Sequence, residues 1–300
     1  MMEPNVYQAD IEKMLRECKI DDDNIQKNKL NISDIIGNED HLNNYIDELN
    51  QFIKMKKTTL ELIEYARSIC YGLPSEEELT EILSNSKNIK DKGLFGKIVE
   101  YGLFGQKPNS YSTPDLIKLG YDIKACAFKT LKNTGKNAKE RQTLTNCGTT
   151  KNYDSFKNIS ENTDFSECPY YQKSSRFILF VRNDDKLKLK TFDQILNQCM
   201  LVIVFFNIEK LPIELKQTIN EDYARIRQSI IEKRVSQKGQ KYLHIHPHGS
   251  GHGSGTRALG FTSTFITYIV AMRLSEMYIK KIEDILITSG RSIAINNIYL

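Results

Sequence analysis

The sequence predicts an α/β protein with a central mixed β-sheet flanked by helices and a helical N-terminal region. Two dense apolar runs, 176–182 and 200–206, have the length and composition of buried central strands. Stretches with helical periodicity lie between the expected strands, and such alternation is typical of α/β folds. The sequence pattern changes from mainly helical to mixed at residue 91. We therefore predict a helical region over 1–90 and a core over 91–300.

The first ninety residues are expected to form three or four helices. We expect a short helix at 5–19 and a polar linker at 21–37. Residues 40–69 have a strong helical signal, because apolar residues recur there at helical spacing. They are Leu42, Tyr45, Ile46, Leu49, Phe52 and Ile53. Ser75 and Glu78 form a capping box before a further helix. The expected role of this region is packing against the core or against a partner.

The core is expected to alternate between helices, strands and loops. In chain order we first predict a helix at 93–103, a loop at 105–114, a strand at 121–128 and a lysine-rich loop at 129–140. An unassigned polar stretch at 145–172 and the two central strands follow. We then predict a helix at 213–234, a strand at 241–246, a glycine- and histidine-rich loop at 247–256, a strand at 260–270 and a helix at 271–285.

Charge is distributed unevenly along the chain. The net charge is +4, but residues 1–90 hold 18 acidic and 11 basic residues, whereas residues 91–300 hold 20 acidic and 31 basic ones. The core is therefore basic, as expected of a protein that binds a polyanion such as DNA.

Cysteine usage and hydropathy bear on the cellular compartment. None of the six cysteines forms a C-x-x-C pair, so we expect neither a disulfide framework nor a zinc finger. No apolar run is long enough to span a membrane, and the N-terminus lacks the apolar stretch of a signal peptide. A cytoplasmic protein without a membrane partner is expected.

One short motif, P-D-x6-D-x-K, predicts a reaction. Its members are Pro114, Asp115, Asp122 and Lys124, with the second aspartate at the start of an expected strand. Side chains alternate along a strand, so Asp122 and Lys124 point to the same side, and Asp115 can fold back onto it from the preceding turn. Two carboxylates for a divalent metal and a lysine beside the attacking water suggest a metal-dependent nuclease.

Further segments extend this motif into a longer pattern. They are Lys92–Glu100 (K-G-L-F-G-K-I-V-E), Lys173–Arg176 (K-S-S-R) before an apolar run, and Tyr242–His248. In order and spacing, residues 91–280 resemble the MutH-type endonucleases, a family of mismatch-repair nicking enzymes and restriction enzymes directed at GATC. The resemblance implies a restriction-endonuclease-like core, double-stranded DNA as partner and Mg²⁺ as cofactor.

The resemblance also implies roles for individual residues. Asp115 and Asp122 are the expected Mg²⁺ ligands, and Glu100, which matches the family's active-site glutamate, is an expected third ligand. Lys124 is expected to position the attacking water, and Lys173 matches a second lysine of the site. The family's nicking member has Glu where this chain has Asp122, a change that shortens the side chain but keeps its charge.

Two segments are predicted to contact DNA. The stretch 129–141 carries five basic residues against one acidic residue, which suits a phosphate backbone. These residues are Lys129, Lys132, Lys136, Lys139 and Arg141. By resemblance, His246 and His248 occupy the base-reading positions, with Arg257 assisting. Nicking members have Arg and Lys at those two histidine positions, so the recognition sequence is open. A zinc site at the histidines is the alternative, although Pro247 interrupts the strand.

The sequence leaves several functions open. The leading prediction is a type II restriction endonuclease acting at a short GATC-like site. A mismatch-repair nicking enzyme and a catalytically silent DNA-binding module are the alternatives, and the site chemistry alone also allows an RNA or structure-specific nuclease. A monomer would make nicks, whereas a homodimer on DNA would make double-strand breaks.

Overall fold

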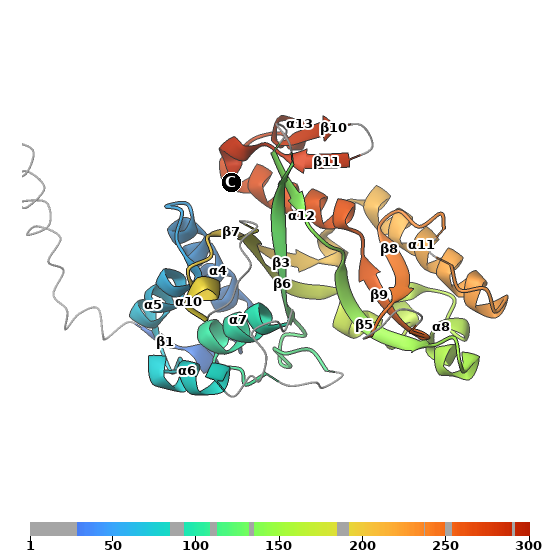
Figure 1. Cartoon of the computed structure of the whole chain (residues 1–300), viewed down its shortest axis with the longest axis horizontal. Coiled ribbons are helices and arrows are strands. Elements are labelled where there is room, and N and C mark those ends of the chain that lie inside the picture. The colour runs from blue at the N-terminus through green and yellow to red at the C-terminus, as the bar shows by residue number, and fades with distance from the viewer. Residues whose placement is uncertain are drawn as a thin grey trace, which may run out of the picture.

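The computed structural model describes residues 29–84, 93–108, 113–131, 135–184, 192–236, 238–249, 254–289 and 292–300. The helix expected at 5–19 lies outside these residues, as does Lys132. Figure 1 shows the central strands with helices on one side and a smaller sheet with further helices on the other. The predicted α/β class with a mixed sheet and a helical N-terminal region is confirmed.

The described N-terminal region is mostly helical. Its elements are β1 (Leu30–Asn31), α3 (Ile32–Ile35), α4 (Glu39–Ile53), α5 (Thr59–Ile69), β2 (Cys70–Tyr71) and α6 (Glu76–Ser84). The signal at 40–69 is therefore two helices, because Lys56 takes a left-handed φ of 57° between them and Thr58 and Glu61 make a capping box that starts α5. The predicted capping box of Ser75 and Glu78 is confirmed at the start of α6.

The core begins with helix α7 and continues through the strands of two sheets. Its first half comprises α7 (Leu94–Phe104), β3 (Asp122–Leu131), β4 (Gly135–Ala138), β5 (Gln142–Thr149), η1 (Tyr153–Phe156), α8 (Lys157–Ser160), η2 (Phe165–Glu167), α9 (Tyr171–Ser174), β6 (Arg176–Asn183) and α10 (Phe192–Leu196). Its second half comprises β7 (Met200–Asn207), η3 (Ile208–Lys210), α11 (Ile213–Ile231), β8 (Leu243–Pro247), β9 (Thr256–Phe261), α12 (Ser263–Tyr278), α13 (Ile282–Ile285), β10 (Leu286–Ser289), β11 (Ser292–Ile295) and η4 (Asn297–Tyr299).

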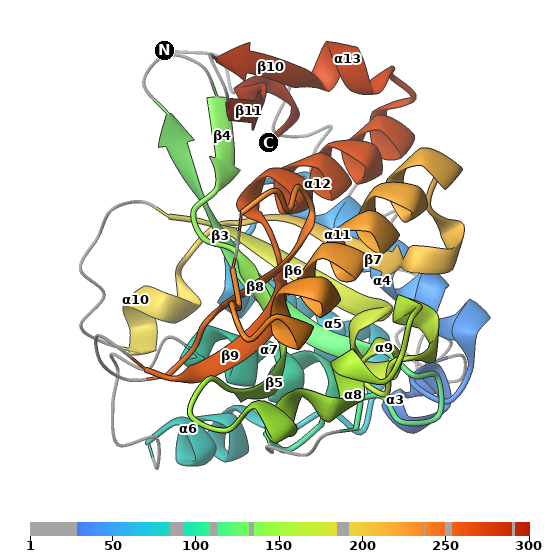
Figure 2. The ribbon, with the colours of Figure 1, turned by 90° about the vertical axis from the view of Figure 1, so that its right-hand side faces the viewer.

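Two sheets organise the core. The larger has six strands in the order β10-β11-β4-β3-β6-β7, with β3 and β6 parallel and every other pair antiparallel. The smaller is antiparallel, in the order β5-β9-β8. Figure 2 shows β5, β8 and β9 beside β3 and β6, with α11 and α12 nearby.

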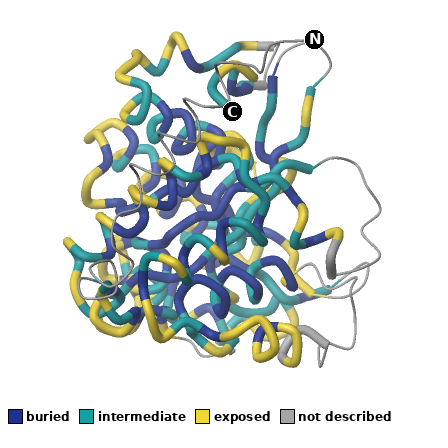
Figure 3. The backbone as a smooth tube through the Cα atoms, turned by 90° about the vertical axis from the view of Figure 1, so that its left-hand side faces the viewer, coloured by how far each residue is buried: buried dark blue, intermediate teal, exposed yellow. Residues whose placement is uncertain are grey.

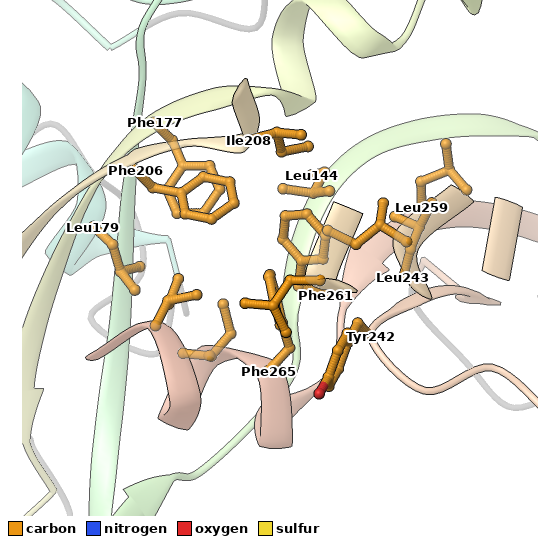
Figure 4. Close-up of a cluster of buried hydrophobic side chains, with 14 of the residues drawn as sticks. Leu144, Phe177, Leu179, Phe206, Ile208, Tyr242, Leu243, Leu259, Phe261 and Phe265 are labelled. Atoms are coloured by element: carbon orange, nitrogen blue, oxygen red, sulfur yellow. The ribbon is translucent and has the colours of Figure 1, made fainter. Parts of the chain in front are cut away.

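The β6–β7 part of the large sheet is buried on both faces. Along β6, Phe177, Leu179 and Val181 belong to one hydrophobic cluster, and Ile178 and Phe180 belong to another. We call the first the C-terminal cluster, since it includes the small sheet, α11 and α12 (Figure 4). The second, the N-terminal cluster, includes α4, α5 and α7. This two-sided burial explains the continuous apolar runs of β6 and β7. Figure 3 shows buried backbone, in dark blue, through the middle of the molecule.

Three sequence predictions for the core need correction, and the linker predicted at 21–37 is wrong over its described part, which contains β1 and α3. The strand predicted at 260–270 is wrong: β9 ends at Phe261 and helix α12 begins at Ser263, capped by Thr262. Because α12 is buried on several sides, its apolar residues show little helical periodicity, and they look like a strand. The loop predicted at 129–140 is largely a β3–β4 hairpin. The unassigned stretch at 145–172 contains most of β5 and four short helices.

Candidate active site

The turn before β3 brings Asp115 to the start of that strand. Leu116 and Tyr121 pair across the turn, and Gly120 takes a left-handed φ of 71°, which glycine adopts without strain. The Ile123 amide donates a hydrogen bond of 2.8 Å to Asp115 Oδ2. The expectation that Asp115 folds back towards the strand is therefore confirmed.

Asp122 is the most buried of the candidate site residues, at 1% exposure. Lys124 forms an ion pair with it from the same side of β3, as the alternation along a strand requires. Lys173 Nζ lies 3.8 Å from Asp122 Oδ1. The structure therefore brings together an aspartate and two lysines of the sequence prediction.

Parallel pairing explains how Lys173 reaches a strand 49 residues earlier in the chain. Asp122 of β3 is in register with Phe177 of β6, and the short helix α9 directly precedes β6. The Lys173 ammonium also donates a hydrogen bond of 3.1 Å to the Thr113 carbonyl, just before Asp115. Both the turn and the lysine are thereby held at the same end of β3.

Glu100 approaches the two aspartates from α7. Burial, and then the negative charges of Asp115 and Asp122, raise the pKa of Glu100 to about 8. Burial, and then the charge of Asp122, raise the pKa of Asp115 to about 6. Glu100 Oε1 is buried, and no hydrogen-bond donor among the described residues reaches it. Three mutually repelling carboxyl groups with an unsatisfied oxygen form a site that favours a cation.

The residues fit Mg²⁺ better than a metal held entirely by protein. Within the described ranges, no group of three or more His, Cys, Asp and Glu side chains is arranged to hold a metal ion by itself. Mg²⁺ commonly takes only one or two carboxylates and completes its shell with water and phosphate oxygens. Asp115 and Asp122 supply such a pair, with Glu100 beside them.

Those predicted DNA-binding lysines that the structure describes lie on the β3–β4 hairpin or directly after it. Lys136 donates hydrogen bonds to Thr130 and to Asn183, and Lys139 pairs with Asp184 at 2.9 Å. Lys129 is half-buried and Arg141 is exposed. These four residues do lie on neighbouring strands or just beyond them, but two of the ammonium groups are engaged within the protein.

The two histidines of β8 and the one that directly follows the strand differ in their exposure. His244 and His246 are buried, at 8% and 2% exposure, whereas His248 is exposed. Burial lowers the pKa of His244 to about 4 and that of His246 to about 3, with the positive charge of Arg141 acting in the same direction. In this conformation only His248 of the two predicted base-reading histidines faces solvent.

Arg257 contacts its own strand, and the described histidines lack a metal-binding arrangement. The Arg257 guanidinium donates to the carbonyls of Ser254 and Thr256, so it supports the strand that carries it. The described histidines do not form a three-ligand metal group, which gives the zinc alternative no support among the residues that the structure describes.

Two backbone carbonyls of the site could not be predicted from residue types. The Thr113 carbonyl accepts from Lys173, and the Leu144 carbonyl lies 3.5 Å from Lys124 Nζ. Any residue supplies a carbonyl, so the sequence carries no signal for either contact.

Comparison with protein-family models and with curated proteins finds no match. The likeness to the MutH-type endonucleases therefore depends on the motifs themselves. None of the helices that the structure describes has the length and apolar character needed to cross a membrane.

Proposed function

We propose that this protein is a Mg²⁺-dependent endonuclease that hydrolyses phosphodiester bonds in double-stranded DNA, with a restriction-endonuclease-like core of the MutH type. One observation carries the proposal: two aspartates, a glutamate and two lysines gather at the start of β3 from four separate segments. In keeping with the resemblance, we propose type II restriction activity at a short GATC-like site.

Each side chain has a distinct part in the proposed reaction. Asp115 and Asp122 would hold Mg²⁺, with Glu100 beside them, and the ion would supply positive charge to a phosphate undergoing attack. Lys124 orients the attacking water and stabilises negative charge as it develops on the phosphoryl oxygens. Lys173 adds a second positive charge on the same carboxylate. Water attacks phosphorus in line with the leaving oxygen, and the resemblance implies 5′-phosphate and 3′-hydroxyl ends.

The carboxyl cluster argues against a DNA-binding module without activity. Three acidic groups facing a phosphate would repel it, and a protein that only binds DNA gains nothing from them. The choice between a nicking and a double-strand-cleaving enzyme depends on whether one or two copies act on the duplex.

The test is cleavage of plasmid DNA by the purified full-length protein. Methylated and unmethylated plasmids are incubated with Mg²⁺ or with EDTA, and the product ends are sequenced. We expect Mg²⁺-dependent cleavage at a short, discrete sequence. An absence of cleavage on both plasmids, with RNA and branched DNA also left intact, would contradict nuclease activity.

Two variants assign the activity to this site. We expect Asp115→Ala to abolish cleavage and to keep or strengthen DNA binding, because it removes negative charge near phosphate. The exposed Asp154→Ala is the matched control. We expect Lys173→Ala to lower the single-turnover rate at saturating DNA by about 10²–10³-fold, with the exposed Lys280→Ala as its control. Wild-type rates in both site variants would show that another site performs the cleavage.

A further inference from the structure

Strand β5 is irregular next to the candidate active site. Thr143 pairs with Gly260 of β9 and Thr145 pairs with Leu259, so Leu144 between them has no partner on β9. This extra residue is a β-bulge, a feature that often redirects groups beside active sites. The side chain of Leu144 lies in the C-terminal cluster (Figure 4), while its carbonyl oxygen lies 3.5 Å from Lys124 Nζ.

The residue before the bulge is held by a buried histidine. His246 Nε2 of β8 lies within hydrogen-bond distance of Thr143 Oγ1, at 3.2 Å. β8 and β5 are not neighbours, because β9 lies between them. The imidazole therefore reaches across β9 to bind the strand that contains the bulge.

Gly260 makes this reach possible. A Cβ atom at position 260 would lie 2.7 Å from His246 Cε1 and 2.7 Å from the Gln142 carbonyl, closer than real Cβ contacts. The position pairs with Thr143 on one side and with His244 on the other, so it lies on the path between the two outer strands. The glycine, the buried imidazole and the threonine hydroxyl thus form a chain of contacts across the small sheet.

We propose that His246 is a positioning residue that, through Thr143 and the bulge at Leu144, holds the ammonium group of Lys124 in place at the candidate active site. The expected effect on the cleavage rate rests on the proposed function. The contact between His246 and Thr143 does not depend on that function. It gives His246 a role that does not require its ring to reach a DNA base.

Thr143 offers the cleanest variants, because its side chain is small and half-buried. Thr143→Val removes the hydroxyl and keeps the shape, and Thr143→Ser keeps the hydroxyl. We expect Thr143→Val to lower the single-turnover cleavage rate by about tenfold to a hundredfold, since small misplacements of a reacting group have effects of that size. DNA affinity and melting temperature are expected to stay near wild type, and Thr143→Ser to retain most of the rate.

A second measurement does not depend on cleavage. The rate of reductive methylation of Lys124 is followed by mass spectrometry, with the exposed Lys280 as an internal reference. We expect Lys124 to react several times faster in Thr143→Val and in His246→Ala than in wild type, because its contact with the Leu144 carbonyl is loosened. His246→Gln, which retains polar atoms at the end of its side chain, is expected to restore part of the protection. His248→Ala, two residues further along the chain and exposed, is the control.

The cleavage rate and the Lys124 methylation rate together distinguish failure of the proposed function from failure of the positioning role of His246. If wild type cleaves DNA and Thr143→Val cleaves at the same rate with unchanged Lys124 reactivity, the positioning role is wrong and the proposed function stands. If wild type does not cleave, the proposed function fails, and Lys124 reactivity alone decides whether His246 holds the lysine. Equal Lys124 reactivity in wild type, Thr143→Val and His246→Ala overturns the inference in either case.

Discussion

The two faces of the β3-β6-β7 sheet are covered in different ways. On one side, Asn50 of α4 bonds directly to the free edge of β7: it donates to the Ile203 carbonyl and accepts from the Ile203 amide. Thr59 of α5 bonds to the Gln198 carbonyl, just before β7 begins. On the other face, a second sheet packs through side chains, with its own bulges and two buried imidazoles. The first arrangement protects a sheet edge, and the second reaches the candidate active site.

The described part of the N-terminal region has a structural role, because it covers the outer edge of β7. β7 is the last strand of its sheet, and its outer amides and carbonyls need partners. Asn50 pairs with Ile203 much as a neighbouring strand would, and the Lys57 carbonyl accepts from the Met200 amide further along. The expectation that this region packs against the core is confirmed for α4 and α5.

The small-sheet side has a corresponding anchor at Asp222. This carboxylate is fully buried on α11 and accepts three backbone hydrogen bonds, from Lys241, Tyr242 and Leu243, at 2.8, 2.6 and 3.0 Å. It fixes the start of β8, the strand that carries the histidines. Single substitutions at Asp222 and at Asn50 test whether the two anchors are equally important.

The largest effect is expected for Asp222→Ala. Three amides, two of them buried, lose a charged acceptor, so we expect the free energy of unfolding to fall by about 4–5 kcal/mol. Urea unfolding followed by circular dichroism measures it, with Glu221→Ala, an exposed neighbour on the same helix, as control. A loss no larger than that of the control would show that water replaces the carboxylate without cost.

Asn50→Ala is expected to have the next largest effect. The amide and carbonyl of Ile203 both lose their partner at a buried edge, which predicts a loss of about 2–4 kcal/mol. The same unfolding measurement applies, with the exposed Gln51→Ala as control. A larger loss here than for Asp222→Ala would reverse the comparison and make the helical side the more important anchor.

Acid should weaken the small-sheet side selectively. His244 and His246 have folded pKa values of about 4 and about 3, below the usual 6.5, so the unfolded chain binds protons that the folded chain does not. Their contribution to stability is complete above about pH 6.5 and is lost as the pH falls towards those lower values. Over that range each histidine lowers the free energy of unfolding by up to about 1.4 kcal/mol for each pH unit of acidification.

The measurement is urea unfolding of wild type and His246→Gln between pH 7 and pH 5. We expect a shallower pH dependence in the variant, because one buried group that resists protonation has been removed. Arg141 and His248 lie close enough to His246 to influence its pKa, so His248→Gln is the control. Parallel pH profiles for wild type and both variants would contradict a buried neutral His246.

The smallest effect concerns two left-handed residues, one on each side. Ile279 ends α12 with a φ of 52° and 91% exposure, and Lys56 lies in the turn between α4 and α5 with a φ of 57°. A β-branched residue is strained in this conformation, so Ile279→Gly is expected to raise stability by about 1 kcal/mol. Lys56→Gly should gain less, because its side chain is unbranched at Cβ. Thermal unfolding measures both, and an equal gain would remove the distinction.

The sequence by itself determined the elements whose signals are local. The stripe from Leu42 to Ile53, the capping box at Ser75 and the apolar runs of β6 and β7 depend on periodicity and on neighbouring residues, so they were predicted. The P-D-x6-D-x-K spacing likewise placed Asp115, Asp122 and Lys124 around one point, because the geometry of a turn and a strand fixes that arrangement over ten residues.

Only the tertiary structure decided the contacts between distant segments. Pairing of β3 with β6 brings Lys173 to Asp122. Helix α12 is buried on several sides, so its sequence shows no clear apolar face. Asn50 bonds to Ile203, a residue 153 positions later in the chain. The exposure of each β8 histidine and the carbonyl beside Lys124 depend on a bulge and on a glycine in another strand. Such contacts join atoms that every residue carries, or surfaces that exist only after packing, so no pattern along the chain encodes them.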